Sequence, residues 1–118
     1  MTQIKKLFAI QALVILTLTG CASVNNATGA AALSIKTMAE TTREECGAKH
    51  PAPCLPGSAI TTQVRDRIKE ILTTAQMHLE DANRVRQGGV GHSCTEFHDC
   101  LSMTHSLLSS VEVMLERR

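Results

Sequence analysis

The chain has 118 residues, of which 43% are apolar, 19% charged and 2% aromatic. This length suits one small globular domain and excludes a multidomain enzyme. Twelve basic and eleven acidic side chains give a formal net charge of +1, a balance that provides no basic stripe and excludes a nucleic acid as the main partner.

Residues 1–20 have the pattern of a secretory signal peptide. Lys5 and Lys6 supply the basic start, and the run from Leu7 to Leu18 is almost entirely apolar. At about 12 residues, this run is too short to span a bilayer, which takes roughly 20. The two lysines are the only charged residues before position 21, so the chain that remains after cleavage is nearly neutral.

The segment ends in Leu18-Thr19-Gly20-Cys21, which resembles the lipobox of bacterial lipoprotein precursors. The resemblance implies that lipoprotein signal peptidase cleaves after Gly20 and that the Cys21 thiol becomes the thioether carrying a diacylglycerol. Each buried acyl methylene contributes roughly 0.8 kcal/mol, so several acyl chains anchor a protein stably in a lipid bilayer. Ala22, in place of an aspartate, resembles the sorting pattern for the outer membrane. We therefore expect a lipid-anchored protein on the periplasmic face of the outer membrane.

Residues 21–29 are small and polar and have no periodic apolar face. We expect them to form a tether between the lipid and a helical domain over residues 30–118. The first predicted helix covers about residues 30–45, which are rich in helix formers. Its apolar stripe is thin and consists of Ala31, Ile35 and Met38. The following loop, residues 46–57, contains all three prolines of the chain and cannot be helical throughout.

The longest predicted helix covers about residues 58–87, with Ser58 or Thr61 as its N-terminal cap. Its apolar positions recur in steps of four and three and share one face: Val64, Ile68, Ile71, Ala75, His78, Ala82 and Val85. Within that face, we expect His78 to be packed and hydrogen-bonded. Charged residues of both signs predict a solvated face opposite: Arg65, Asp66, Arg67, Lys69, Glu70, Glu80, Asp81, Arg84 and Arg86.

A glycine-rich turn at residues 88–91 ends this helix, and a last helix is predicted over about residues 95–117. Its stripe repeats the same spacing: Phe97, Leu101, Thr104, Leu108, Val111 and Leu115. The two long helices therefore form an antiparallel hairpin, on which the first helix packs. We predict an all-α fold, a small three-helix bundle stapled by disulfides.

Apart from the cysteine of the lipobox, four cysteines remain, an even number that favours two disulfides in an oxidising compartment. The long predicted helix places Cys46 and Cys54 about 40 Å from Cys94 and Cys100, whereas the Cα atoms of a bridge lie within about 7 Å of each other. We therefore predict the local pairs Cys46–Cys54 and Cys94–Cys100. The second pair requires Cys94 to lie outside the regular helix. Neither pair has the Cys-x-x-Cys spacing of thiol oxidoreductases, which favours a structural role.

Two cysteines and three histidines lie between residues 92 and 105, and these residue types bind zinc or copper. Because disulfide formation would consume the thiolates, the candidate metal ligands are His92, His98 and His105. A periplasmic metal-binding lipoprotein is therefore one alternative function. We otherwise expect no cofactor beyond the covalent lipid.

Catalytic patterns are weak in this sequence. Ser106 lies within a predicted continuous helix, without the exposed turn or the oxyanion site that a nucleophile needs. The segment Gly88-Gly89-Val90-Gly91 lacks the lysine and hydroxyl ending of a phosphate-binding loop. We expect that the protein is not an enzyme.

A tethered helical bundle without catalytic groups can offer a groove in which partner helices or extended peptides dock. We therefore expect a binding or adaptor module for another envelope protein. In size, lipid anchor, helical content and disulfide use, the chain is similar to the pilotins of secretion systems, which chaperone a secretin to the outer membrane, and also to the exclusion lipoproteins of plasmids and phages. These likenesses share no motif, so they imply no binding residues. A third possibility is a structural envelope component that self-associates through the apolar seams of the two long helices.

Overall fold

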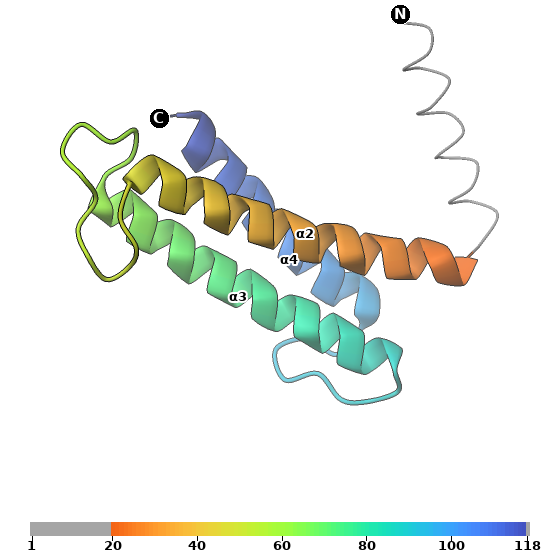
Figure 1. Ribbon diagram of the computed structural model, residues 1–118. Helices are drawn as coiled ribbons and strands as arrows, with labels where there is room; N and C mark the ends of the chain where they lie inside the picture. The colour runs from red at the N-terminus through yellow and green to blue at the C-terminus, as the bar shows by residue number, and fades with distance from the viewer. Residues whose placement is uncertain (1–19, 118) are drawn as a thin grey trace, which may run out of the picture.

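The computed structural model describes residues 20–117, which form three helices (Figure 1). α2 spans Gly20–Cys46, α3 spans Thr62–Arg86 and α4 spans Phe97–Glu116. Within residues 20–117 there is no strand. The predicted all-α fold and three-helix bundle are therefore confirmed. The predicted signal peptide lies outside the described residues, apart from its last residue.

The helices alternate in direction. In Figure 1, α2 and α3 lie side by side and run in opposite directions, and α4 returns behind them in the direction of α2. α3 and α4 form the predicted antiparallel hairpin, and α2 packs on both of them. Within the described part of the chain, no helix is sufficiently long and apolar to span a bilayer.

The core lies mainly between α3 and α4. Its buried residues are Ala31, Ile68, Ile71, Leu72, Ala75, Leu79, Leu108, Val111 and Leu115. Six of these positions belong to the predicted stripes of the two long helices: Ile68, Ile71, Ala75, Leu108, Val111 and Leu115. α2 contributes only the small Ala31 to this buried set, and its larger residues Ile35 and Met38 are half-buried against it. The thin stripe expected for this helix is therefore confirmed.

The first helix begins earlier than predicted. α2 starts at Gly20 instead of about residue 30, so residues 21–29, which we expected to form a tether, are helical. Two physical reasons account for the difference. The segment contains no proline, and alanines from residue 27 onward favour the helix. Thr28 is only 7% exposed, so packing extends beyond the predicted start of the helix.

The two long helices begin later than predicted. α3 starts at Thr62 instead of residue 58, because the extended Thr61 accepts a hydrogen bond from the amide of Val64 at 3.1 Å and caps the helix. Thr61 is one of the two caps that the sequence indicates. The other, Ser58, instead donates its hydroxyl to the carbonyl of Ile60 at 2.8 Å within the loop. α4 starts two residues later than predicted.

Both predicted disulfides are present. The Cα atoms of Cys46 and Cys54 lie 4.6 Å apart, and those of Cys94 and Cys100 lie 5.5 Å apart. Cys94 precedes α4, as the pairing requires. One bridge therefore closes the loop after α2, and the other ties the loop after α3 to the first turn of α4.

Candidate binding groove

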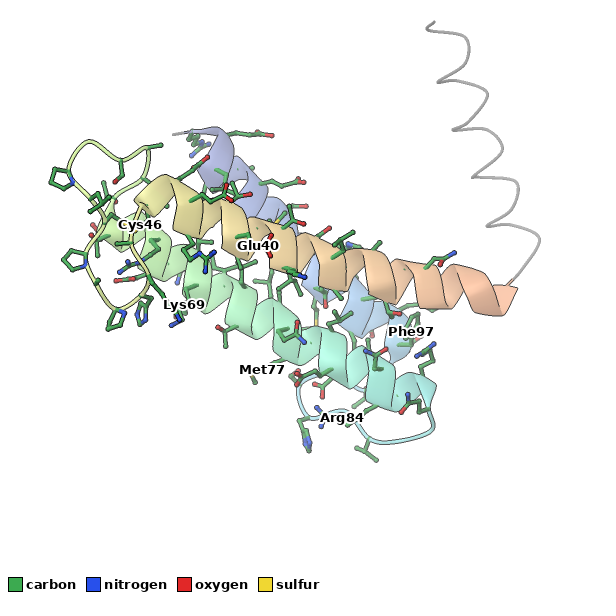
Figure 2. The ribbon with its side chains drawn as sticks, in the orientation of Figure 1. Glu40, Cys46, Lys69, Met77, Arg84 and Phe97 are labelled. Atoms are coloured by element: carbon green, nitrogen blue, oxygen red, sulfur yellow. A yellow bond between two sulfur atoms is a disulfide. The ribbon has the colours of Figure 1, made fainter. Side chains whose placement is uncertain are left out.

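A groove of about 570 Å³ lies between α2 and α3 and ends at the loop after α2. Its floor is apolar, with Ile35 from α2 and Ile68 and Leu72 from α3, and Met77 of α3 lies on its edge. Ile68 and Leu72 belong to the core, whereas Met77 is 53% exposed. Figure 2 shows Met77 and Lys69 along the same edge of α3. The volume falls within the usual range for binding pockets in proteins.

Small side chains on α2 account for this space. Ala39 and Thr42 line the groove, and Thr42 turns its hydroxyl back to the carbonyl of Met38 at 2.6 Å. The facing part of α3 presents Ile68 and Leu72. Because alanine and threonine are too short to fill the space above these two residues, the helices contact each other without closing the groove.

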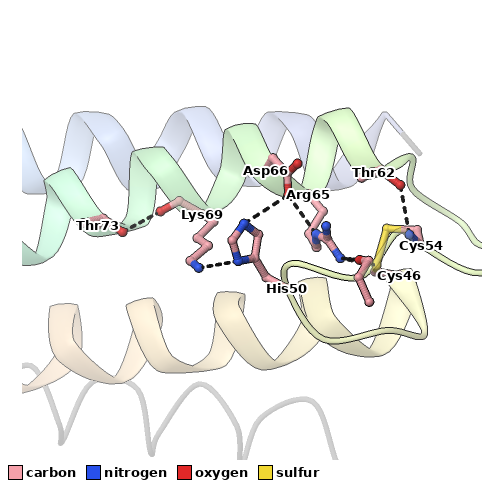
Figure 3. A network of polar contacts seen from close by, with 9 residues as sticks. Cys46, His50, Cys54, Thr62, Arg65, Asp66, Lys69 and Thr73 are labelled. Carbon is pink, nitrogen blue, oxygen red and sulfur yellow. Dashed lines mark hydrogen bonds and ion pairs between the residues drawn. A yellow bond between two sulfur atoms is a disulfide. The ribbon is translucent and has the colours of Figure 1, made fainter.

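The buried side chain of Arg65 fixes the loop after α2 onto α3, as Figure 3 shows. Its Nη1 donates to the carbonyl of Ala52 and lies 3.3 Å from the sulfur of Cys46. Its Nε donates to Oδ1 of Asp66 at 2.9 Å. Arg65 was predicted on the solvated face of its helix, but it is only 3% exposed. The prediction was wrong because the periodicity of a helix does not reveal that the preceding loop folds over this face.

Further bonds hold the loop in shape. The bridge between Cys46 and Cys54 closes it, the amide of Leu55 donates to the carbonyl of Cys46, and the amide of Cys54 donates to the hydroxyl of Thr62, both at 2.9 Å. Gly47 has a φ of +73°, and a Cβ at this position would lie 2.7 Å from a methyl carbon of Leu55. A glycine is therefore required where the chain leaves α2.

The loop end of the groove is basic. Lys69 donates from Nζ to Nδ1 of His50 at 2.8 Å (Figure 3). Four residues with a permanent positive charge line the groove, against one acidic residue: Arg43, Lys49, Arg65, Lys69 and Glu80. Among residues 20–117, neither lysine of this set nor Arg43 forms an ion pair with a carboxylate. The groove therefore combines an apolar lining with three cations that have no carboxylate partner among these residues, Arg43, Lys49 and Lys69.

A second polar cluster lies at the opposite end of α3. Asp81 accepts hydrogen bonds from the amides of His92 and Ser93 at 3.1 and 2.8 Å and from the Ser93 hydroxyl at 2.5 Å, and it pairs with Arg84 at 3.1 Å. The Ser93 hydroxyl, followed by the two amides, holds the pKa of Asp81 well below its usual value. Burial opposes this effect, and Arg84 reinforces it.

This cluster corrects one prediction and confirms another. Asp81 was expected on the solvated face, but it is 2% exposed. The error arises because the amides that bind this carboxylate belong to the loop after the helix. The spacing of residues within the helix does not predict them. His78 is 9% exposed, and its Nδ1 lies 2.9 Å from the Ser93 hydroxyl, which confirms the expected packed and hydrogen-bonded histidine.

The candidate metal ligands are not brought together. Among residues 20–117, the one group of three potential ligands whose donor atoms lie within 4.8 Å of one another is His78, Asp81 and Cys94. The predicted set lies outside this group: His92, His98 and His105. Cys94 offers no thiolate because its sulfur is bonded to that of Cys100. The structure therefore favours a structural role for this group.

The apolar seams considered for self-association face each other within one chain. Ile68 of α3 and Val111 and Leu115 of α4 are buried in the same core. These faces are therefore already covered in the monomer. The groove between α2 and α3, by contrast, keeps an apolar side chain, the exposed Met77, within reach of a partner.

Comparison with known proteins finds no matching family model, and neither a curated protein nor a solved structure shows significant similarity to this chain.

Proposed function

We propose that the protein is a lipoprotein that is anchored through Cys21 on the periplasmic face of the outer membrane and binds another envelope protein. The lipobox Leu18-Thr19-Gly20-Cys21 supports the anchor. Two disulfides support an oxidising compartment outside the cytoplasm. In this proposal the lipid is the only covalent group, and the helical domain acts by binding, without catalysis.

The single observation that carries the binding function is the groove between α2 and α3. Its floor includes core residues, and Met77 on its edge remains 53% exposed. Binding of a partner would remove this large apolar side chain from water, which lowers the free energy of the complex. The groove thus gives a bundle of this size a defined place for a partner to dock.

The proposal agrees with the likeness to pilotins, which combine a lipid anchor with a small helical domain that binds a larger envelope protein. This likeness concerns architecture alone and supplies no residues. The residues proposed to contact the partner therefore come from the groove of this chain.

The anchor is tested by mass spectrometry of the mature protein isolated from membranes. We expect the N-terminal peptide to begin at Cys21 and to carry the mass of a diacylglyceryl thioether. A Cys21→Ala variant should lose the lipid and remain unprocessed. A mature protein with an unmodified Cys21 would contradict the proposed anchor.

The binding function is tested by site-specific photocrosslinking in intact cells. A benzophenone amino acid replaces Met77 in the groove or, as the matched control, Met103 on α4, which is 41% exposed. We expect one prominent adduct with an envelope protein from position 77 and no such adduct from position 103. Identical adduct patterns from both positions, or no adduct from position 77, would contradict the proposed function.

A further inference from the structure

We propose that the occupant of the groove is an amphipathic helix with acidic side chains at the end that lies beside the Cys46–Cys54 loop. This inference rests on the proposed function and specifies the chemistry of its partner. Its three supports are the dimensions of the groove, the kind of backbone that the groove can accommodate, and the distribution of charge along it.

The groove has the length of a short helix. On α3 its lining extends from Arg65 to Glu80, which corresponds to about 22 Å at 1.5 Å per residue. A helix of about 15 residues covers this distance with four turns. Its apolar side chains at helical spacing would lie on Leu72 and Met77 of α3 and on Ile35 of α2.

The groove lacks a sheet edge, and this determines which backbone conformation its occupant can adopt. An extended peptide binds tightly when a sheet edge offers amides and carbonyls to its main chain. Residues 20–117 contain no strand, and the groove walls are two helices whose main-chain groups are largely paired internally. A helix satisfies its own main-chain hydrogen bonds and needs only side-chain contacts. The groove therefore favours a helical occupant.

The charges of the groove are separated along its length. Lys49, Arg65 and Lys69 line the end near the loop, and Glu80 lies fifteen residues beyond Arg65 on α3. The two lysines have no carboxylate partner among residues 20–117, and Nη2 of the buried Arg65 has no hydrogen-bond partner there. Acidic side chains of the occupant at this end would complement the two exposed lysines, and the same contacts fix its direction in the groove.

The inference is tested by combining the crosslinker at position 77 with reversed charges in the full-length protein in cells. The double variant Lys49→Glu and Lys69→Glu changes two exposed side chains. We expect the adduct yield to fall about tenfold. Arg67→Glu, on the same helix but 62% exposed and outside the groove, is the matched control and should leave the yield unchanged. Unchanged far-ultraviolet circular dichroism would show that the variants are folded.

Mass spectrometry of the adduct then identifies the segment that was captured. We expect an amphipathic segment with acidic residues, and replacing those residues with lysine should restore the adduct with the double variant. A neutral or basic segment, or a yield that charge reversal does not change, would overturn the inference and leave the proposed function standing. A lipid adduct, or no adduct from position 77 at all, would overturn both.

Discussion

Ser93 donates two hydrogen bonds to one carboxylate oxygen of Asp81, from its amide at 2.8 Å and from its hydroxyl at 2.5 Å. The Ser93 hydroxyl donates its only proton to Asp81, so it can only accept from His78. The 2.9 Å contact between Nδ1 of His78 and the Ser93 hydroxyl therefore requires Nδ1 to be the donor. The carboxylate therefore anchors the loop after α3 and determines which nitrogen of the histidine carries a proton.

This arrangement predicts a loss of stability in acid. The pKa of Asp81 in the folded protein lies below its ordinary value of 3.8, so the charged carboxylate stabilises the fold fully above that value. The stabilisation is lost as the pH falls through the lower pKa of the folded state. We expect the urea midpoint to decrease between about pH 4 and pH 2.

The variant Asp81→Asn should show a lower midpoint at pH 7 and a weaker dependence on pH below 4. Glu112→Gln, which changes an exposed carboxylate on α4, is the control and should behave like the unmodified protein. Equal pH dependence in the Asp81→Asn variant and the unmodified protein would contradict the role assigned to this carboxylate.

The two disulfides should have similar effects on stability and different effects on binding. Replacing both cysteines of either bridge with alanine should lower the free energy of unfolding by about 2 kcal/mol, because each bridge closes a short loop. Loss of Cys46–Cys54 also releases the loop that carries Lys49, so crosslinking from position 77 should decrease. Loss of Cys94–Cys100 should leave crosslinking intact. Equal effects of the two replacements on crosslinking would contradict the role of the first loop in the groove.

Filling the groove should block binding without unfolding the protein. Ala39 is exposed and lines the groove, so Ala39→Phe should occupy the space above Leu72 and suppress the adduct from position 77. The free energy of unfolding should change by less than about 0.5 kcal/mol, as is usual for surface substitutions. Ala30→Phe, on the opposite side of α2, is the matched control. Equal adduct yields from the two variants would show that the groove is not the docking site.

Two valines of α4 test the assignment of the core. Val111 is fully buried, whereas Val113 is 43% exposed. Val111→Ala should lower the free energy of unfolding by about 2 kcal/mol, because it removes buried methyl groups and leaves a cavity. Val113→Ala should cost less than about 0.5 kcal/mol. Denaturant titrations of both variants measure this difference.

The sequence predicts those features that depend on local spacing. The stripe containing Ile68 and Ala75 identifies the core face of α3, and the separation of the cysteines along the chain is sufficient to select the observed pairs. Thr61 is recognisable as a cap because a hydroxyl directly before an apolar repeat satisfies the first free amides of a helix.

The features that the sequence does not predict depend on segments that meet only after folding. Arg65 and Asp81 have the spacing of surface residues, and each is buried by a loop that folds back over its helix. The groove is equally hidden, because it arises where the short side chains of Ala39 and Thr42 lie opposite Leu72 on another helix. The thin stripe on the first helix was the only sign that this contact would be incomplete.

The continuity of α2 has a consequence for how the protein stands on a membrane. An unbroken helix runs from Gly20 to Cys46, so Ile35 lies about 21 Å along the axis from Cys21. With Cys21 acylated, this helix would keep the docking face within about 21 Å of the lipid attachment point, measured along the helix axis. A partner segment would then have to lie close enough to the membrane to reach that face, so its distance from the lipid, as well as its chemistry, would decide whether it binds.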